Sequence, residues 1–195
     1  MILVIGRPAL DERGALQGNA ALVAVAAARA GAQVEVVGSV GDDHEGDAVA
    51  VELARAGIGH AALLRDPAGA TPRGSGPAAG PPPRLDGSDV ELGLLYLADC
   101  RVLVVAEWLG EDVLAVAKAA AAYHSAELIV LLEPQTPEPK GLPARATLLR
   151  APAEGGAAFA DVVGRYAAAL AAGQPPAPAW AAALAGTGWS ETGEA

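Results

Sequence analysis

The stretch that decides the fold is residues 17–46, which read QGNAALVAVAAARAGAQVEVVGSVGDDHEG. A turn at Gly18 and Asn19 opens an alanine-rich run that stops at Gly31, as helices commonly stop at glycine. An apolar run follows and is typical of a buried strand. That strand leads to Gly41 and two aspartates at the start of a second helical pattern. The stretch therefore predicts a helix, a strand and a helix joined by glycine turns.

The same alternation of apolar strands and helices continues along most of the chain. Strands that are apolar on both faces indicate a mainly parallel sheet with helices on both sides. We therefore expect an α/β fold, a three-layer, doubly wound sandwich, with any ligand at the carboxyl ends of the strands. The expected strands are residues 2–5, 33–37, 61–64, 101–105, 127–132 and 147–149, and the expected helices are residues 17–30, 44–56, 111–123, 156–171 and about 179–184.

Two stretches differ from this pattern. Residues 66–89 are rich in proline and glycine, which predicts an exposed, irregular loop. Residues 173–195 begin with several prolines and are expected to form one short helix and a tail, packed onto the body by Trp180 and Trp189. We divide the chain accordingly into an α/β domain at residues 1–172 and a C-terminal helix and tail.

The composition excludes several classes of protein. The 195 residues are 52% hydrophobic but only 4% aromatic, so small side chains must fill the core and helices must pack closely. A net charge of −10 without a basic cluster argues against nucleic acid or an anionic membrane as a partner. No segment is long and apolar enough to span a bilayer, and the N-terminus lacks the features of a signal peptide, so we expect a cytoplasmic protein. The only cysteine, Cys100, is expected to be a buried structural thiol.

Common nucleotide and metal motifs are missing. The first strand leads into Gly6, Arg7 and Pro8 rather than a glycine-rich turn, so there is no dinucleotide-binding fingerprint. No glycine–lysine–serine/threonine sequence indicates a P-loop. The three histidines are scattered and are expected at the surface rather than as metal ligands.

Residues 17–46 closely resemble the N-terminal signature of the ribokinase-like (PfkB-type) carbohydrate kinases. The spacing from Gly18 to Gly31 to Gly41 fits the pattern of that family. The resemblance implies a ribokinase-like core, and it identifies the chain as a truncated or degenerate member.

Two weaker matches extend the resemblance over roughly residues 1–160. Residues 131–134 (LLEP) look like the family's strand ending in Asp-Pro. Residues 152–154 (PAE) resemble its Pro-Asn-Glu element, which lies near the phosphates and the metal.

The resemblance implies a set of site residues. Glycine lets the backbone approach a sugar, and free amides at a helix start can meet its hydroxyl groups. The same glycines and acids can equally be inherited helix caps and turns, and this alternative stays open. The implied substrate-binding residues are Asp11, Gly18, Asn19, Gly41 and Asp42, and the residues implied near phosphate and metal are Glu133 and Glu154.

The chain also departs from the family where the sugar would be held. Leu22 stands where the family has a sugar-binding asparagine, and Asp11 is at most a remnant of a substrate-binding aspartate. Few residues separate the first strand from Gly18, and the proline- and glycine-rich loop occupies the place of a second lid segment. We therefore expect the β lid, which closes over the sugar and excludes water, to be missing.

The largest departure is the absence of the family's Gly-Ala-Gly-Asp motif. Its aspartate is the general base of the family, and its glycine amides form the anion hole. The nearest strings are residues 154–159 (EGGAAF) and 186–189 (GTGW), and neither has the aspartate. The first is a decayed motif with Ala157 at the aspartate position, or the family pattern is truncated before the nucleotide-binding part. Both interpretations remove the base.

Three functions remain open at this stage. The first is a non-catalytic protein that binds a protein partner or forms a homodimer. The second is a residual binder of a sugar, nucleoside or nucleotide without turnover. The third is a working ATP-dependent sugar kinase with a rebuilt site. No catalytic residue is assigned and no metal ligand or cofactor is expected, with ATP and Mg²⁺ required only if activity is retained.

Overall fold

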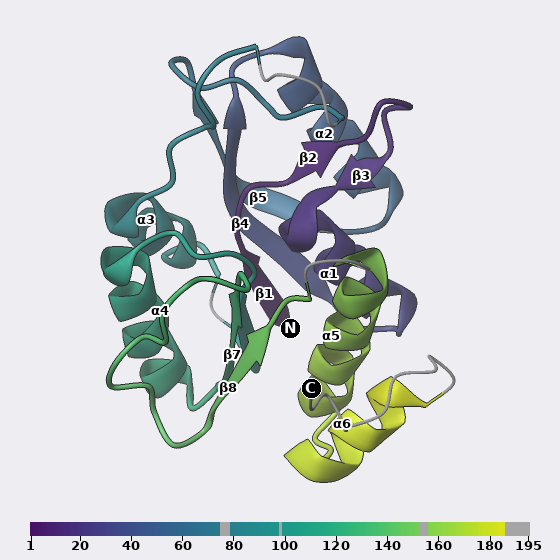
Figure 1. The fold of residues 1–195 in the computed structure, drawn as a ribbon, viewed down its shortest axis with the longest axis vertical. Coiled ribbons are helices and arrows are strands. Elements are labelled where there is room, and N and C mark those ends of the chain that lie inside the picture. Colours follow the sequence, from purple (N-terminus) through teal and green to yellow (C-terminus); the bar gives the residue numbers. More distant parts are fainter. Residues whose placement is uncertain (75–78, 98, 153–155, 186–195) are drawn as a thin grey trace.

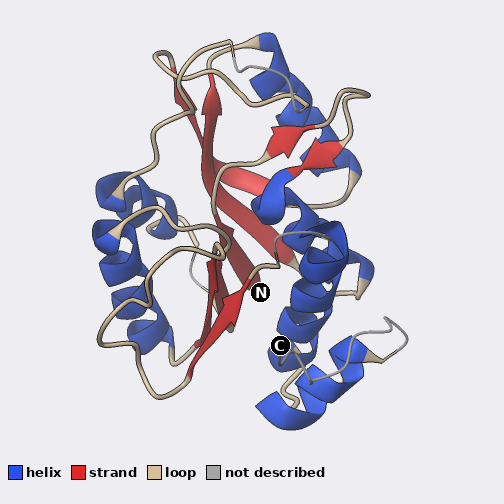
Figure 2. Cartoon of the chain, in the orientation of Figure 1, coloured by secondary structure: helices blue, strands red, loops and turns tan. Residues whose placement is uncertain are grey.

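The computed structural model describes residues 1–74, 79–97, 99–152 and 156–185. A six-stranded parallel sheet runs through the middle of the molecule in the order β5-β4-β1-β6-β7-β8 (Figure 1). Helices cover both of its faces (Figure 2), which confirms the expected three-layer, doubly wound α/β sandwich. The strands are β1 Ile2–Ile5, β4 Val34–Gly41, β5 Gly59–Asp66, β6 Val102–Val105, β7 Glu127–Leu132 and β8 Ala146–Arg150. The helices are α1 Gly18–Arg29, α2 His44–Arg55, α3 Gly87–Leu94, α4 Glu111–His124, α5 Gly156–Ala171 and α6 Pro176–Leu184.

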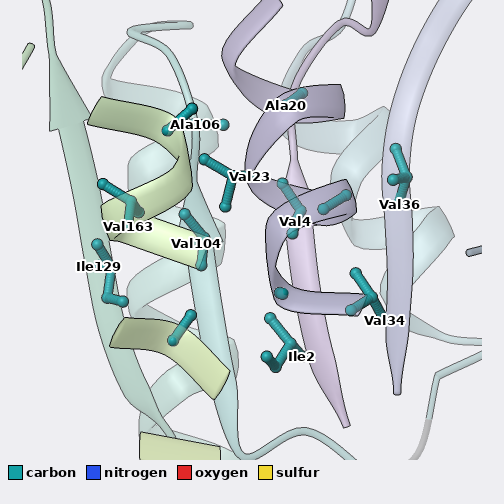
Figure 3. Packing of buried hydrophobic residues seen from close by; sticks show 14 of the residues in the cluster. Ile2, Val4, Ala20, Val23, Val34, Val36, Val104, Ala106, Ile129 and Val163 are labelled. Carbon is teal, nitrogen blue, oxygen red and sulfur yellow. The ribbon is translucent and has the colours of Figure 1, made fainter. Parts of the chain in front are cut away.

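Two apolar clusters hold the helices to the sheet. One lies between the sheet and α1, α2 and α5, and it continues to α6. The other lies between the sheet and α3 and α4 on the opposite face. In the first cluster, Val23 of α1 and Val163 of α5 pack with Val104 of β6 (Figure 3).

The close packing expected from the small side chains is confirmed between α1 and α5. A Cβ atom added to Gly164 of α5 would lie 2.5 Å from the Cβ of Ala26 and 2.7 Å from the carbonyl oxygen of Val23. The missing side chain therefore lets the two helices approach closely. Below them, α6 packs on α5, where the rings of Tyr166 and Trp180 meet edge to face at 5.2 Å. The other tryptophan expected to anchor the tail, Trp189, lies outside the described residues.

Cys100 is buried, as expected for a structural thiol. Burial raises the pKa of the Cys100 thiol to about 11, with the N-terminal ammonium group opposing the shift. The thiol is therefore protonated at neutral pH and points its hydrogen toward the carbonyl oxygen of Val102 at 3.5 Å.

The expected loop at residues 66–89 was wrong at its end, because the helix α3 starts at Gly87. Asp86 and Asp89 form a capping box, in which each side chain accepts a hydrogen bond from the backbone amide of the other residue. The short helix buries only Gly87, Val90 and Gly93, so its apolar pattern was too brief to detect beside the proline-rich loop.

The sequence predicts that the family's β lid is missing, and a small hairpin lies where that lid would be. Its strands, β2 Ala9–Leu10 and β3 Leu16–Gln17, contain two residues each. Backbone hydrogen bonds join Leu10 to the segment at Pro72 and Gly74. At the position of the lid, the chain thus has a short two-stranded hairpin that is hydrogen-bonded to residues 72–74.

Candidate functional site

The carboxyl edge of the sheet gathers most of the site residues that the sequence predicted. Gly41 ends β4 and Asp42 follows it, while Glu133 follows β7. Gly18 and Asn19 open α1. In doubly wound sheets, ligands bind at this edge where the order of the strands reverses, and here the reversal falls between β1 and β6.

An ion pair bridges the point of reversal. Arg7 follows β1 and Glu107 follows β6, and their side chains are 25% and 23% exposed. The guanidinium donates from Nη2 to Oε2 at 2.7 Å and from Nε to Oε1 at 3.3 Å. The backbone amide of Arg7 donates to the same Oε1 at 2.6 Å. One carboxylate therefore ties together the two strands between which a ligand would be expected.

The acidic residues around Arg7 favour the charged form of its guanidinium group. Hydrogen bonding to Glu107 raises the pKa of Arg7, burial lowers it, and the charges of Glu107 and Glu133 raise it further. Glu133 itself is exposed, and its carbonyl oxygen accepts a hydrogen bond from Arg150 at 3.0 Å. Sequence reasoning missed the pair because 100 residues separate its members, and the Gly6-Arg7-Pro8 turn was noted only for lacking further glycines.

The second aspartate of the Gly-Asp-Asp stretch organises the turn between β4 and α2. Asp43 is the N-cap of α2, and its Oδ1 accepts from the amide of Gly46 at 2.7 Å. Its other contacts come from Thr71, whose amide donates to Oδ2 and whose hydroxyl donates to Oδ1, both at 2.8 Å. The Thr71 hydroxyl oxygen in turn accepts from the amide of Gly41 at 2.8 Å. Asp43 thus connects the end of β4, the start of α2 and the loop after β5.

The ionisation of Asp43 follows from these contacts. Burial alone would raise the pKa of Asp43, but hydrogen bonds from Thr71 and Gly46, together with the charge of Arg65, lower it overall. The carboxylate is therefore ionised at neutral pH.

Glycine is required in this turn because the backbone is crowded. A Cβ atom on Gly41 would collide with the Asp43 carboxylate and lie 2.8 Å from the carbonyl oxygen of Gly69. One on Gly46 would collide with the carbonyl oxygen of Gly41. Asp42 differs from its neighbours: its amide donates to the carbonyl of Asp66 at 3.1 Å, and its residue is exposed.

Asp11 lies at the tip of the β2–β3 hairpin. Its Oδ1 accepts from the amides of Arg13 and Ala15, both at 2.8 Å. The side chain therefore shapes the turn, and it also borders a cavity of about 310 Å³.

The start of α1 shows why Gly18 and Leu22 occupy their positions. Gly18 has φ = +81°, a conformation that favours glycine, and a Cβ atom there would lie 3.5 Å from the carbonyl oxygen of Arg7. Gln17 precedes the helix without a side-chain cap, and Asn19 is half-buried. Leu22 packs against the apolar cluster, so it contributes to the core at the position where the family has a polar residue.

Part of the predicted phosphate-binding region lies outside the described residues. Glu154, which was predicted to lie near phosphate and metal, is the residue concerned. The first turn of α5 contains no acidic residue, and Ala157 is exposed there. Within the described ranges, no group of three acidic, histidine or cysteine side chains is arranged to hold a metal ion. Among the helices of those same ranges, none is long and apolar enough to cross a membrane.

Comparison with known proteins first identifies the fold. A structure from Escherichia coli described as a ribokinase II with ATP and Mg²⁺ is similar, with 14% identity, 93% of this chain and 89% of that chain covered, and a TM-score of 0.65. Phosphofructokinase-2 from Escherichia coli has 15% identity, 95% and 91% coverage and a TM-score of 0.66. Fructokinase from Vibrio cholerae O395 has 19% identity, 69% and 50% coverage and a TM-score of 0.51.

The sequence comparison then identifies the family to which the signature points. Residues 16–73 match the model of the pfkB family of carbohydrate kinases. No sequence among the curated proteins matches. The resemblance drawn from residues 17–46 is thus confirmed, and the chain carries the PfkB signature on a ribokinase-like fold.

Proposed function

We propose that this chain is a PfkB-type protein that no longer transfers phosphate and acts as a non-catalytic binding or dimerisation protein. The observation that carries the proposal is the ion pair between Arg7 and Glu107 at the reversal point of the sheet. Its three hydrogen bonds occupy the polar groups that face the usual ligand position. Asp43 supports the same conclusion, because its carboxylate is committed to capping α2 and holding Thr71.

The start of α5 also supports loss of phosphoryl transfer. In the family pattern the general base would follow a glycine pair here, and this chain has Ala157 instead. An alanine cannot accept a proton from a sugar hydroxyl. We therefore assign no catalytic residue and no bound nucleotide to the protein.

Exposed apolar side chains support a role in protein contact. Leu92, Leu95 and Tyr96, at the end of α3 and just beyond it, are 46%, 77% and 73% exposed. A second copy of this chain or another protein would shield them.

A coupled assay of ADP formation tests the proposal. The chain is incubated with ATP, Mg²⁺ and a panel of hexoses, pentoses and nucleosides, beside an active fructokinase as the positive control. We expect no sugar-dependent ADP formation. Turnover that depends on a sugar and disappears in Asp42→Ala, but persists in the matched surface variant Asp47→Ala, would overturn the proposal.

A second candidate, binding of a sugar or nucleotide without turnover, rests on the hairpin. Asp11 borders a cavity of about 310 Å³ at the hairpin tip, and Asp42 is an exposed acid on the carboxyl edge. A ligand that binds the native state raises its unfolding midpoint. A midpoint that rises with a sugar or nucleotide in the unaltered chain, and not in Asp11→Asn, favours this candidate over pure protein binding.

Light scattering on the purified chain tests the dimer directly. A dimer that dissociates in Leu95→Glu, with unchanged circular dichroism, fits the proposal. A strict monomer that captures no partner protein would contradict both dimerisation and protein binding as the function.

A further inference from the structure

A cavity of about 550 Å³ is lined by residues of β4, β5 and α3 and of the loop between β5 and α3. The helix α3 lies on the opposite side of the sheet from α1 and α5 (Figure 1). The cavity opens at the carboxyl ends of β4 and β5 and is large enough for a small organic molecule. None of the site residues predicted from the sequence lines it. The lining includes Ser39, Leu64, Asp66, Arg84, Asp86 and Asp89.

The floor of this cavity contains a buried hydroxyl group that has no hydrogen-bond partner in the described part of the chain. Ser39 lies on β4 between Gly38 and Val40, and its residue is 1% exposed. Its Oγ makes no hydrogen bond to any of the described residues. Buried polar groups are nearly always paired, because an unpaired hydroxyl loses its bonds to water without replacement. A neighbour on the same face, Val37, shows that the sheet accepts an apolar side chain at such a position.

The rim of the cavity is negatively charged. Asp66 accepts hydrogen bonds from the amides of Arg84 and Ala68 at 2.7 and 2.9 Å. Asp86 accepts from the amides of Ser88 and Asp89 at 2.9 and 3.1 Å. These backbone hydrogen bonds lower the pKa of Asp66 and of Asp86, so both carboxylates are ionised at neutral pH.

The basic residues at the cavity do not cancel this charge. The side chain of Arg84 is 78% exposed and pairs with Asp86. Arg65 directs its guanidinium to Asp47 of α2 at 2.7 Å and to the carbonyl oxygen of Gly41 at 3.4 Å. Three aspartates and two arginines therefore line the cavity, so its lining carries a net charge of −1.

We infer that this cavity binds a small organic amine, with its ammonium group near the carboxylates and Ser39. An ammonium group brings three donors and no acceptor, and the lining offers four groups that can accept, which are three carboxylates and the Ser39 hydroxyl oxygen. Its carbon stem would lie along Leu64 and Leu92, the apolar residues of the lining. The inference does not depend on whether the chain transfers phosphate.

Calorimetric titration of the full chain with 1,4-diaminobutane tests the inference, with 1,4-butanediol as the neutral analogue of equal length. We expect saturable binding of the diamine and none of the diol. Losing one charge-assisted hydrogen bond weakens binding by about tenfold or more, so Ser39→Ala and Asp89→Asn should each bind the diamine at least that much less tightly.

Asp161→Asn is the matched control, because it changes the net charge as Asp89→Asn does. Asp161 pairs with Arg165 on α5, on the other face of the sheet. This variant should bind the diamine as tightly as the unaltered chain. Absence of binding, equal binding of the diol, or equal weakening by Asp89→Asn and Asp161→Asn would overturn the inference. Asparagine still accepts the hydrogen bond from Asp86, so Asp89→Asn should fold.

Discussion

The two faces of the sheet use their polar residues differently at the carboxyl edge. On the face of α1 and α2, the second acid of the PfkB signature is engaged, because Asp43 caps a helix and accepts two hydrogen bonds from Thr71. On the face of α3, Asp66 and Asp86 also accept hydrogen bonds from backbone amides, but Ser39 is buried beside an open cavity and bonds to none of the described residues. An inherited motif can therefore persist because the fold needs it. Unpaired polar groups are the better guide to a ligand.

The largest expected effect comes from filling the space at Gly41. A valine there would collide with the Asp43 carboxylate and crowd the carbonyl oxygen of Gly69. We expect Gly41→Val to lower the free energy of unfolding by about 3 kcal/mol or more, or to prevent folding. Urea unfolding followed by circular dichroism measures this. Gly57→Ala, at a position with no neighbour within 4 Å but φ = +70°, should cost about 1 kcal/mol and serves as the control for backbone conformation.

Breaking the ion pair at the strand reversal should have the next largest effect. Glu107→Ala removes the acceptor of three hydrogen bonds from Arg7, which is only a quarter exposed. We expect a loss of about 1–3 kcal/mol in urea unfolding. Glu52→Ala breaks the pair with Arg55, whose side chain is 71% exposed, and should cost less than about 0.5 kcal/mol. Equal losses in the two variants would contradict a structural role for the Arg7–Glu107 pair.

Acid should lower the free energy of unfolding, because it protonates aspartates that accept hydrogen bonds from backbone amides. The pKa values of Asp43, Asp66 and Asp86 lie below the usual 3.8 in the folded chain. Their contribution to stability is therefore complete above that value and is lost as pH falls through the lower folded pKa values. Urea midpoints should be level above about pH 5 and drop below about pH 4. Midpoints that stay constant down to about pH 3 would show that these carboxylates are not held as described.

The smallest change in the free energy of unfolding, and the only increase, is expected for a substitution at Ser39. Ser39→Ala removes a buried hydroxyl that bonds to no described residue, so the unligated chain should gain up to about 1 kcal/mol or stay unchanged. Thr71→Ala removes a paired hydroxyl and should instead lose about 1–2 kcal/mol. Thermal unfolding compares the two. A loss in Ser39→Ala equal to that in Thr71→Ala would remove the contrast between the faces.

The sequence predicted the sheet because its strands are continuous apolar runs and its helices end at glycines such as Gly31. It did not predict α3, whose apolar pattern is short, or the hairpin at Leu10 and Leu16, whose two-residue strands have no measurable period. The sequence also predicted that a strand ends near Gly41 and that a helix opens at Gly18, and the structure has β4 ending at Gly41 and α1 beginning at Gly18. The partners of Arg7 and the isolation of Ser39 depend on residues distant in the chain, so no local pattern could indicate them.

Asp43, the second aspartate of Gly41-Asp42-Asp43, stabilises the fold, because its carboxylate is fully engaged in capping α2 and in hydrogen bonds from Thr71. Urea unfolding of Asp43→Ala and Asp42→Ala tests this most directly, since the two variants change the same residue type at adjacent positions. Losing the helix cap and the bonds to Thr71 should cost Asp43→Ala about 2–3 kcal/mol, while Asp42→Ala stays within about 0.5 kcal/mol of the unaltered chain. Equal losses, or a larger loss in Asp42→Ala, would contradict the account.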